Sequence, residues 1–222
     1  MIKGKLFLRK RLFYLHLEMN YSYLALGDSY TIGERVLLAE SFPYQTVRLL
    51  RQTAVGAESR RQGFGWQFTA AEIIAKTGWT TDELNTAIQQ TTFLKQYNVV
   101  SLLIGVNNQY RGRSVTEFAT EFKQLVKIAV VLAGENPAAV FILSIPDWGI
   151  TPFAEGKDRQ QISCEIDAYN DVCKLISQEI GCTYVDITAS QRADGNNKEF
   201  FAEDGLHPSA KEYAKWAEKL SS

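Results

Sequence analysis

The sequence predicts a three-layer α/β/α domain with a parallel β-sheet, and three observations lead to this fold class. Short apolar runs alternate with longer segments whose apolar residues recur every three or four positions, as in βα units. One run, NVVSLLIG at 98–105, is almost entirely apolar, as expected for a strand covered on both faces. The 222 residues, 45% of them hydrophobic, suffice for one domain with its own core.

Strands and helices are expected in alternation along the chain. The five expected strands are YSYLALG at 21–27, EIIAK at 72–76, NVVSLLIG at 98–105, AAVFILSI at 138–145 and TYVDI at 183–187. The five expected helices cover 42–53, 80–90, 118–132, 162–180 and a C-terminal segment that opens at Pro208. Segment 54–71 has no pattern that predicts a structure.

Caps and apolar faces support these helices. Thr80 is the expected N-cap of the second helix. The apolar face of the fourth helix is expected to consist of Ile162, Ile166, Tyr169, Cys173, Ile176 and Ile180. That of the last helix is expected to consist of Ala210, Tyr213, Ala214, Ala217 and Leu220.

Polar or glycine-containing segments follow the strands. In chain order they are GDSYTIG, TGWTT, GVNNQYRG, PDWGITPF and a loop ending in DGLHPS. Ligands of open parallel sheets bind at the carboxyl ends of the strands. The five segments are therefore expected to meet at one edge of the sheet and to form a site there.

Ser29 is the candidate nucleophile. It follows Gly27 and Asp28 at the end of the first strand, where a sharp turn can point its hydroxyl and nearby peptide N–H groups into a cleft. Serine also commonly caps helices at such junctions. The assignment therefore depends on whether a base can reach it.

His207 is the candidate base, and it is one of only two histidines in the chain. Asp204, three residues earlier, can fix the tautomer of the imidazole and stabilise the imidazolium that forms when His207 takes a proton. Pro208 disfavours a helical backbone at His207. A surface or capping histidine would leave this arrangement unexplained, and His16 has no comparable partners.

Asn107 and Gly78 are the candidate donors to a developing oxyanion. Asn107 offers a side-chain amide after the most apolar strand, and Gly78 offers a peptide N–H that a substrate can approach closely. Each also has a simpler interpretation, because asparagine is frequent in turns and glycine commonly ends strands.

The segments GDSYTIG, TGWTT, GVNN and DGLHP resemble, in order and approximate spacing, the four sequence blocks of the SGNH (GDSL-type) hydrolases. The resemblance extends over residues 21–216. It implies a flavodoxin-like fold with strand order 2-1-3-4-5 and a serine esterase that needs neither metal nor cofactor. The roles that it implies are Ser29 as nucleophile, His207 as base, Asp204 as its partner, and the Ser29 N–H, Gly78 N–H and Asn107 side chain as the oxyanion hole.

The chain departs from the family pattern at two positions. Tyr30 stands where the family's short name has leucine, and Asn108 stands where aspartate is usual. Asn107 keeps the functional position, so we expect its role to survive. Asp28 is expected to brace the turn. Trp148 and Phe153 are interpreted either as walls of the acyl pocket or as plain core.

Two alternatives to an ester hydrolase remain. An acyltransferase would use the same site with an alcohol in place of water, and nothing in the sequence separates the two. A non-catalytic flavodoxin-like binding module is disfavoured by the intact Ser29, Asp204 and His207. The natural substrate, a small-molecule ester of unknown acyl length, stays open. Dinucleotide, P-loop, HExxH and GxSxG motifs are absent.

Composition narrows the possible partners and the setting. The net charge of −1 gives no reason to expect a nucleic-acid partner. The three cysteines, Cys164, Cys173 and Cys182, stand nine residues apart and fit neither a disulfide framework nor a CxxC metal site. Cys173 is interpreted as a core residue. These features favour a cytoplasmic over a secreted setting, and they leave the oligomeric state open.

Residues 1–18 form a basic segment that differs from the rest. It carries five basic residues and one acidic residue, a net charge of +4, which leaves −5 for the remainder of a chain whose total is −1. Basic residues interrupt its apolar run, so it does not fit a signal peptide. We expect the hydrolase domain to span 19–222. Residues 1–18 are interpreted as an upstream start or a loosely ordered basic extension, and we expect them to be dispensable for chemistry. A weak association with membrane surfaces is the alternative role.

Overall fold

Five parallel strands form the central sheet of the computed structural model, which describes residues 20–53, 67–195 and 197–222. Segment 1–18 and most of the unassigned segment 54–71 lie outside the described residues. The strands are β2 (Tyr23–Gly27), β4 (Glu72–Ala75), β5 (Val99–Leu103), β6 (Val140–Leu143) and β7 (Thr183–Val185). Their spatial order is β4-β2-β5-β6-β7, which confirms the predicted order 2-1-3-4-5.

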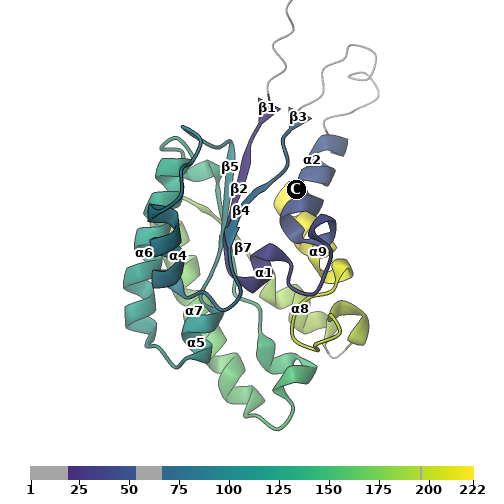
Figure 1. Ribbon diagram of the computed structural model, residues 1–222. Helices are drawn as coiled ribbons and strands as arrows, with labels where there is room; N and C mark the ends of the chain where they lie inside the picture. The colour runs from purple at the N-terminus through teal and green to yellow at the C-terminus, as the bar shows by residue number, and fades with distance from the viewer. Residues whose placement is uncertain (1–19, 54–66, 196) are drawn as a thin grey trace, which may run out of the picture.

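Helices cover both faces of the sheet and give the predicted three layers (Figure 1). Helices α2 (Phe42–Thr53) and α9 (Ala210–Ser221) pack together on one face. Helices α4 (Thr81–Gln89), α6 (Val115–Leu132) and α7 (Arg159–Ile180) lie on the other. The shorter helices include α8 (Thr188–Asp194) and the 3₁₀ turns η1 (Leu38–Glu40), η2 (Pro137–Ala139), η3 (Trp148–Ile150), η4 (Pro152–Ala154) and η5 (Lys198–Phe200).

Helix α4 begins as predicted, with Thr80 as its N-cap. The Thr80 N–H donates to Glu83 Oε2 at 2.9 Å, and the two residues form a reciprocal capping box.

The start of the last helix was predicted wrongly. Helix α9 begins at Ala210, two residues after Pro208, with Ser209 as its N-cap. The reason is a β-type contact. The Ser209 N–H donates to Phe200 O at 2.9 Å, and Pro208 pairs with Phe201 in an antiparallel bridge. The chain therefore stays extended through the proline before it turns into the helix.

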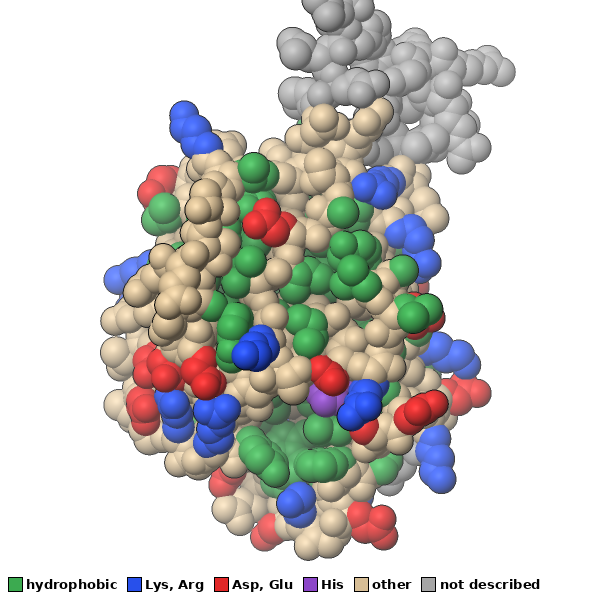
Figure 2. Space-filling model, in the orientation of Figure 1, with side chains coloured by type: hydrophobic (Ala, Val, Ile, Leu, Met, Phe, Trp, Pro, Cys, Tyr) green, Lys and Arg blue, Asp and Glu red, His purple; other side chains and the backbone are tan. Residues whose placement is uncertain are grey.

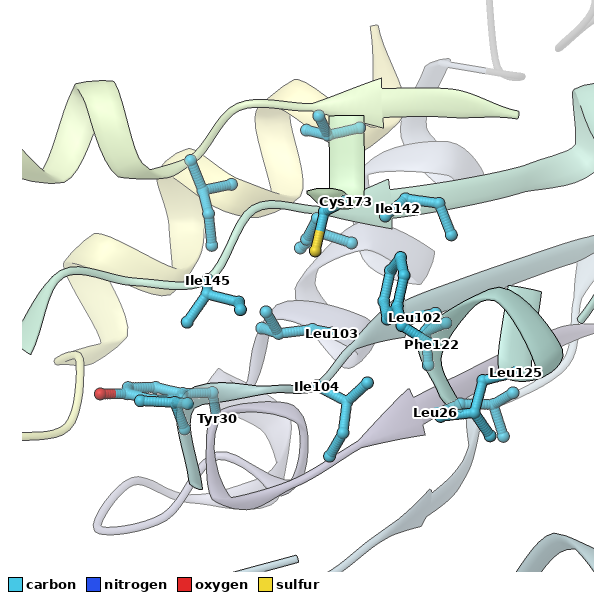
Figure 3. Packing of buried hydrophobic residues seen from close by; sticks show 14 of the residues in the cluster. Leu26, Tyr30, Leu102, Leu103, Ile104, Phe122, Leu125, Ile142, Ile145 and Cys173 are labelled. Atoms are coloured by element: carbon cyan, nitrogen blue, oxygen red, sulfur yellow. The ribbon is translucent and has the colours of Figure 1, made fainter. Parts of the chain in front are cut away.

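The main core lies between the sheet and the helices on both of its faces, and it includes Phe42 of α2 and Trp216 of α9. Figure 3 shows part of it. Cys173 is fully buried there, as its position on the apolar face of α7 predicts. Burial raises the pKa of its thiol far above the usual range. Tyr30 lies at one end of the cluster with its hydroxyl directed away from the other labelled residues (Figure 3).

A second, smaller core holds a short pair of strands that the sequence did not predict. Strands β1 (Asn20–Tyr21) and β3 (Gln67–Phe68) run parallel. The rings of Tyr21 and Phe68 lie 5.3 Å apart, and Arg51 on α2 donates through Nε to the Phe68 carbonyl at 2.8 Å. Strands of two residues are too short to show a period, which is why the sequence pattern misses them.

Candidate active site

A pocket of about 220 Å³ lies where the loops after the strands meet. Figure 2 shows it as a hollow among hydrophobic side chains, with a histidine at its edge. Its walls come from the segments after β2, β5 and β6 and from the loop before α9, so the predicted convergence is confirmed for these segments. The residues that line it are Ser29, Tyr30, Val106, Asn107, Tyr110, Trp148, Phe153, Leu206 and His207.

Ser29 begins the short helix α1 (Ser29–Ile32) directly after β2. Asp28 is the N-cap of this helix, and its Oδ1 accepts from the Tyr30 N–H at 3.0 Å. The cap is therefore Asp28, which braces the turn as predicted, and the Ser29 hydroxyl is not needed for capping. Gly27 is required at the turn, because a Cβ there would lie 2.3 Å from the Leu103 carbonyl oxygen.

His207 and Asp204 form a tight dyad at the edge of the pocket. The Asp204 Oδ2 lies 2.6 Å from His207 Nδ1, and Asp204 Oδ1 accepts from the N–H groups of Leu206 and His207 at 3.0 Å each. The dyad fixes the imidazole with Nδ1 toward the carboxylate, which leaves Nε2 on the opposite side of the ring. His207 is 8% exposed.

Ser29 and His207 line the same pocket, although they stand far apart in the sequence. No hydrogen bond joins their side chains within the described part of the chain. Catalytic contacts of this kind commonly tighten only when substrate is bound. The arrangement therefore places the predicted nucleophile and base in one cavity without yet pairing them.

The charge of Asp204 is stabilised locally. Burial alone would raise the pKa of this carboxyl, but the hydrogen bonds from the His207 ring and from the N–H groups of Leu206 and His207 hold it below its usual range. Arg35 adds a cation, with its Nε 3.7 Å from Asp204 Oδ2. The backbone of Arg35 is left-handed, at φ 69°. No pattern in the sequence predicted that Arg35 lies beside Asp204.

The carboxyl of Asp28, next to the nucleophile, is in a different electrostatic state. Burial raises its pKa to about 7, and the hydrogen bond from the Tyr30 N–H only partly opposes this effect. Its Oδ2 is buried and has no hydrogen-bond partner among the described residues. The ionised form is therefore costly to hold in the fold.

Asn107 and Asn108 are neighbours on helix α5 (Val106–Tyr110) with separate roles. Asn107 lines the pocket, and its Nδ2 donates to the Trp79 carbonyl at 3.0 Å. Asn108 is fully buried. Its Oδ1 accepts from the Thr81 N–H at 3.1 Å and its Nδ2 donates to Thr81 Oγ1 at 2.6 Å. Asn107 thus offers an amide to the pocket, whereas Asn108 ties the loop to α4.

Gly78 lies in the loop between β4 and α4, one residue before Trp79. It adopts a left-handed backbone, at φ 85°, which favours glycine. Its carbonyl accepts from Arg111 Nη2 at 2.7 Å. Gly78 is not among the residues that line the pocket, so its N–H as an oxyanion donor stays a prediction.

The apolar wall of the pocket contains both Trp148 and Phe153. The sequence had left open whether these two residues line the pocket or belong to the core. Tyr110 was missed, although it lies three residues beyond Asn107 and so on the same face of a helix. Its ring meets that of Trp148 edge-on at 5.4 Å between centroids. Trp148 also meets Phe153, with 6.1 Å between centroids.

The described residues also bear on metal binding, membrane insertion and disulfide formation. Within 20–53, 67–195 and 197–222, no group of three or more His, Cys, Asp or Glu residues is placed to hold a metal ion. No helix in those ranges has the length and apolar character that crossing a membrane requires. All three cysteines are free thiols.

Comparison with known proteins places the chain in a family. The model of the GDSL-like lipase/acylhydrolase family matches residues 25–215. No curated protein matches the chain by sequence. Among solved structures, a lipase/acylhydrolase from Enterococcus faecalis aligns with a TM-score of 0.68 at 16% identity, over 90% of this chain and 93% of that one.

Two further solved structures show the same fold. Axe2, an acetylxylan esterase from Geobacillus stearothermophilus, aligns with a TM-score of 0.66 at 19% identity, over 92% of this chain and 94% of that one. A member of the lipolytic G-D-S-L family from Veillonella parvula aligns with a TM-score of 0.64 at 19% identity, over 90% and 96%. As the sequence predicted, the chain belongs to the GDSL-like lipase/acylhydrolase family, a family of ester hydrolases.

Proposed function

We propose that this chain hydrolyses carboxylic esters through an acyl-enzyme on Ser29, with His207 as the base and Asp204 as its partner. The observation that carries the proposal is the 2.6 Å contact between His207 Nδ1 and Asp204 Oδ2, at the edge of a pocket that Ser29 also lines. A histidine oriented by a carboxylate is the arrangement that activates a serine nucleophile.

Acylation follows from these positions. The Ser29 Oγ attacks the ester carbonyl carbon while its proton passes to His207 Nε2, and the carbonyl oxygen becomes an oxyanion. Asn107 Nδ2 and the N–H groups of Ser29 and Gly78 donate to this oxyanion in our proposal. The C–O bond to the alcohol then breaks, and the imidazolium of His207 returns the proton to the leaving alkoxide.

Deacylation repeats the steps with water. His207 takes a proton from water, the hydroxide attacks the acyl carbon, and the oxyanion is held as before. Collapse of this second intermediate breaks the bond to Ser29 Oγ and returns the proton from His207 to it. The carboxylic acid leaves, and Ser29, His207 and Asp204 recover their starting states.

Covalent labelling tests the proposal. A serine-directed phosphonate should add to Ser29 of the wild-type protein, as located by peptide mass spectrometry. Ser29→Ala should remove both the label and the turnover of a short p-nitrophenyl ester, by several orders of magnitude. Ser221→Ala, at the end of α9 and outside the pocket, is the matched control and should keep both.

The outcome also separates the alternatives. Labelling at another serine would move the nucleophile, and a wild type with neither label nor turnover would favour a binding module. Product analysis with an added alcohol would show an acyltransferase, because the new ester would form in preference to the acid.

A further inference from the structure

We propose that Trp148 sets the upper limit of the acyl chain, so that the substrates of this enzyme are esters of short carboxylic acids. The inference rests on the proposed function, because it assumes that Ser29 takes the acyl group. It is carried by the position of Trp148 in the pocket, by the hydrogen bonds that hold its ring, and by the size of the cavity.

The two ends of the pocket differ in what they can accept. Phe153 belongs to the His207 side, because its N–H donates at 3.0 Å to the carbonyl of Gly205 in the same loop. The leaving alcohol must lie on that side, where His207 can protonate it. Tyr110 belongs to the Asn107 side, on α5. The space that remains for the acyl chain is bounded by Val106, Tyr110 and Trp148.

Trp148 is held in place from behind. Its Nε1 donates to Gln109 Oε1 at 2.7 Å, and Gln109 Nε2 donates in turn to Glu165 Oε2 at 2.7 Å. Gln109 is only 6% exposed and Trp148 only 5%. Turning the indole away would leave a buried indole N–H and a buried amide oxygen unpaired, which is costly. The Trp148 side chain is therefore held in one position, and it limits the length of the acyl chain.

The size of the cavity agrees with a short chain. At roughly 30 Å³ for each heavy atom, the volume that a water molecule occupies in the liquid, a pocket of 220 Å³ holds about seven heavy atoms. The ester group itself takes three of these, which leaves about four more. Acetyl to pentanoyl chains fit, whereas a dodecanoyl chain exceeds the space.

A second hollow lies beyond the wall. It measures about 400 Å³, and Gln109, Glu165 and Tyr169 are among its lining residues. Gln109 thus contacts Trp148 on one side and lines this hollow on the other. Trp148 with Gln109 is therefore the partition between the two spaces, and a smaller residue at 148 should let a longer acyl chain pass toward the second hollow.

The test is a series of p-nitrophenyl esters that share one alcohol and run from acetyl through butanoyl, hexanoyl and octanoyl to dodecanoyl. Wild type should have its highest kcat/KM at butanoyl or shorter and lose at least about tenfold at dodecanoyl. Trp148→Leu should move the optimum to a longer acyl chain. Because Trp148 is buried, circular dichroism and the melting temperature must show that this variant folds.

Tyr110→Ala is the second variant, since its side chain is 55% exposed and its loss should spare the fold. It should move the optimum in the same direction by a smaller step. Phe153→Ala is the matched aromatic control on the alcohol side. It should alter the preference among acetate esters of different alcohols and leave the acyl optimum in place. Leu175→Ala, exposed on α7, should change neither preference.

The outcomes separate the two proposals. If wild type hydrolyses none of the esters, the proposed function fails and this inference fails with it. If wild type prefers hexanoyl or a longer chain, or if folded Trp148→Leu and Tyr110→Ala both keep the wild-type optimum on an active enzyme, the inference is overturned and the proposed function stands.

Discussion

His207 contacts Asp204 twice, through its ring Nδ1 at 2.6 Å from Oδ2 and through its N–H at 3.0 Å from Oδ1. One carboxylate therefore fixes both the backbone and the ring of the same residue. The short loop allows this because Gly205 between them is left-handed, at φ 65°. The candidate base and its orienting group thus form one local unit, and only Ser29 comes from a distant part of the chain.

Replacing the two members of this unit should cost different amounts of activity. His207→Ala should lower kcat on a short ester by about 10⁵-fold to 10⁶-fold, because no other base is among the described residues that line the pocket. Asp204→Asn keeps an oxygen that can accept from the Leu206 and His207 N–H groups but loses the charge, so we expect a loss of about 10²-fold to 10⁴-fold. Steady-state kinetics with matched melting curves measures both. Equal losses, or none for Asp204→Asn, would contradict the assignment.

Asn107 and Asn108 offer a matched pair in which the same substitution should give opposite results. Asn107→Ala should lower kcat by about 10²-fold to 10³-fold, the usual effect of one oxyanion donor, with little change in KM or melting temperature. Asn108→Ala leaves Thr81 with a buried unpaired N–H, so it should lower the free energy of unfolding by about 1–3 kcal/mol.

The comparison of these two variants uses a chemical-denaturation curve beside the kinetic assay. If Asn107→Ala instead lowered stability and spared kcat, Asn107 would be a turn residue only.

Gly78→Ala tests the third proposed oxyanion donor. A Cβ at this position would meet only Arg111 Nη2, at 3.8 Å, so space is not the obstacle. The obstacle is the left-handed backbone at φ 85°, because this conformation costs alanine roughly 1–2 kcal/mol. If the Gly78 N–H donates to the oxyanion, the shift of the peptide should raise the activation free energy of turnover by more than it lowers the free energy of unfolding. A variant with a lower melting temperature and an unchanged kcat would remove Gly78 from the oxyanion hole.

Local patterns explain what could be predicted from the sequence. Val100 and Leu102 on β5 are fully buried, and the near-continuous apolar run around them identified a central strand without any tertiary information. Asp204 and His207 contact each other within one short loop, so their pairing also followed from spacing. Ser29 joined them because the carboxyl ends of parallel strands share an edge.

What could not be predicted depends on contacts between distant segments. Arg35 reaches Asp204 from the loop after α1, and Gln109 reaches Trp148 across about forty residues, with no local pattern to mark either pair. Proline generally favours the first position of a helix, which is why Pro208 was predicted to open α9. The bridge between Pro208 and Phe201 instead keeps this residue extended. In each case a tertiary contact decided the outcome, and single-sequence periodicity does not contain it.

Asp28 should make the stability of the protein fall as the pH rises. Burial raises its pKa to about 7 in the fold, whereas the pKa in the unfolded chain is about 3.9. Between these values the folded state keeps a proton that the unfolded state has lost, so the free energy of unfolding decreases with pH, by at most about 1.4 kcal/mol per pH unit. Below this window both states are protonated, and above it both are ionised and the full cost of burying the charge is present.

Asp28→Asn should remove this dependence. Asparagine has nearly the same shape and keeps an oxygen for the Tyr30 N–H, but it cannot ionise. The difference in free energy of unfolding between variant and wild type should therefore move in the variant's favour as the pH rises through the window from about 4 to about 7, and then level off. Urea unfolding at several pH values measures it. Ser29→Ala, which keeps Asp28, is the control and should run parallel to wild type. If Asp28→Asn ran parallel as well, Asp28 would not titrate in this window, and the cost assigned to its buried charge would be wrong.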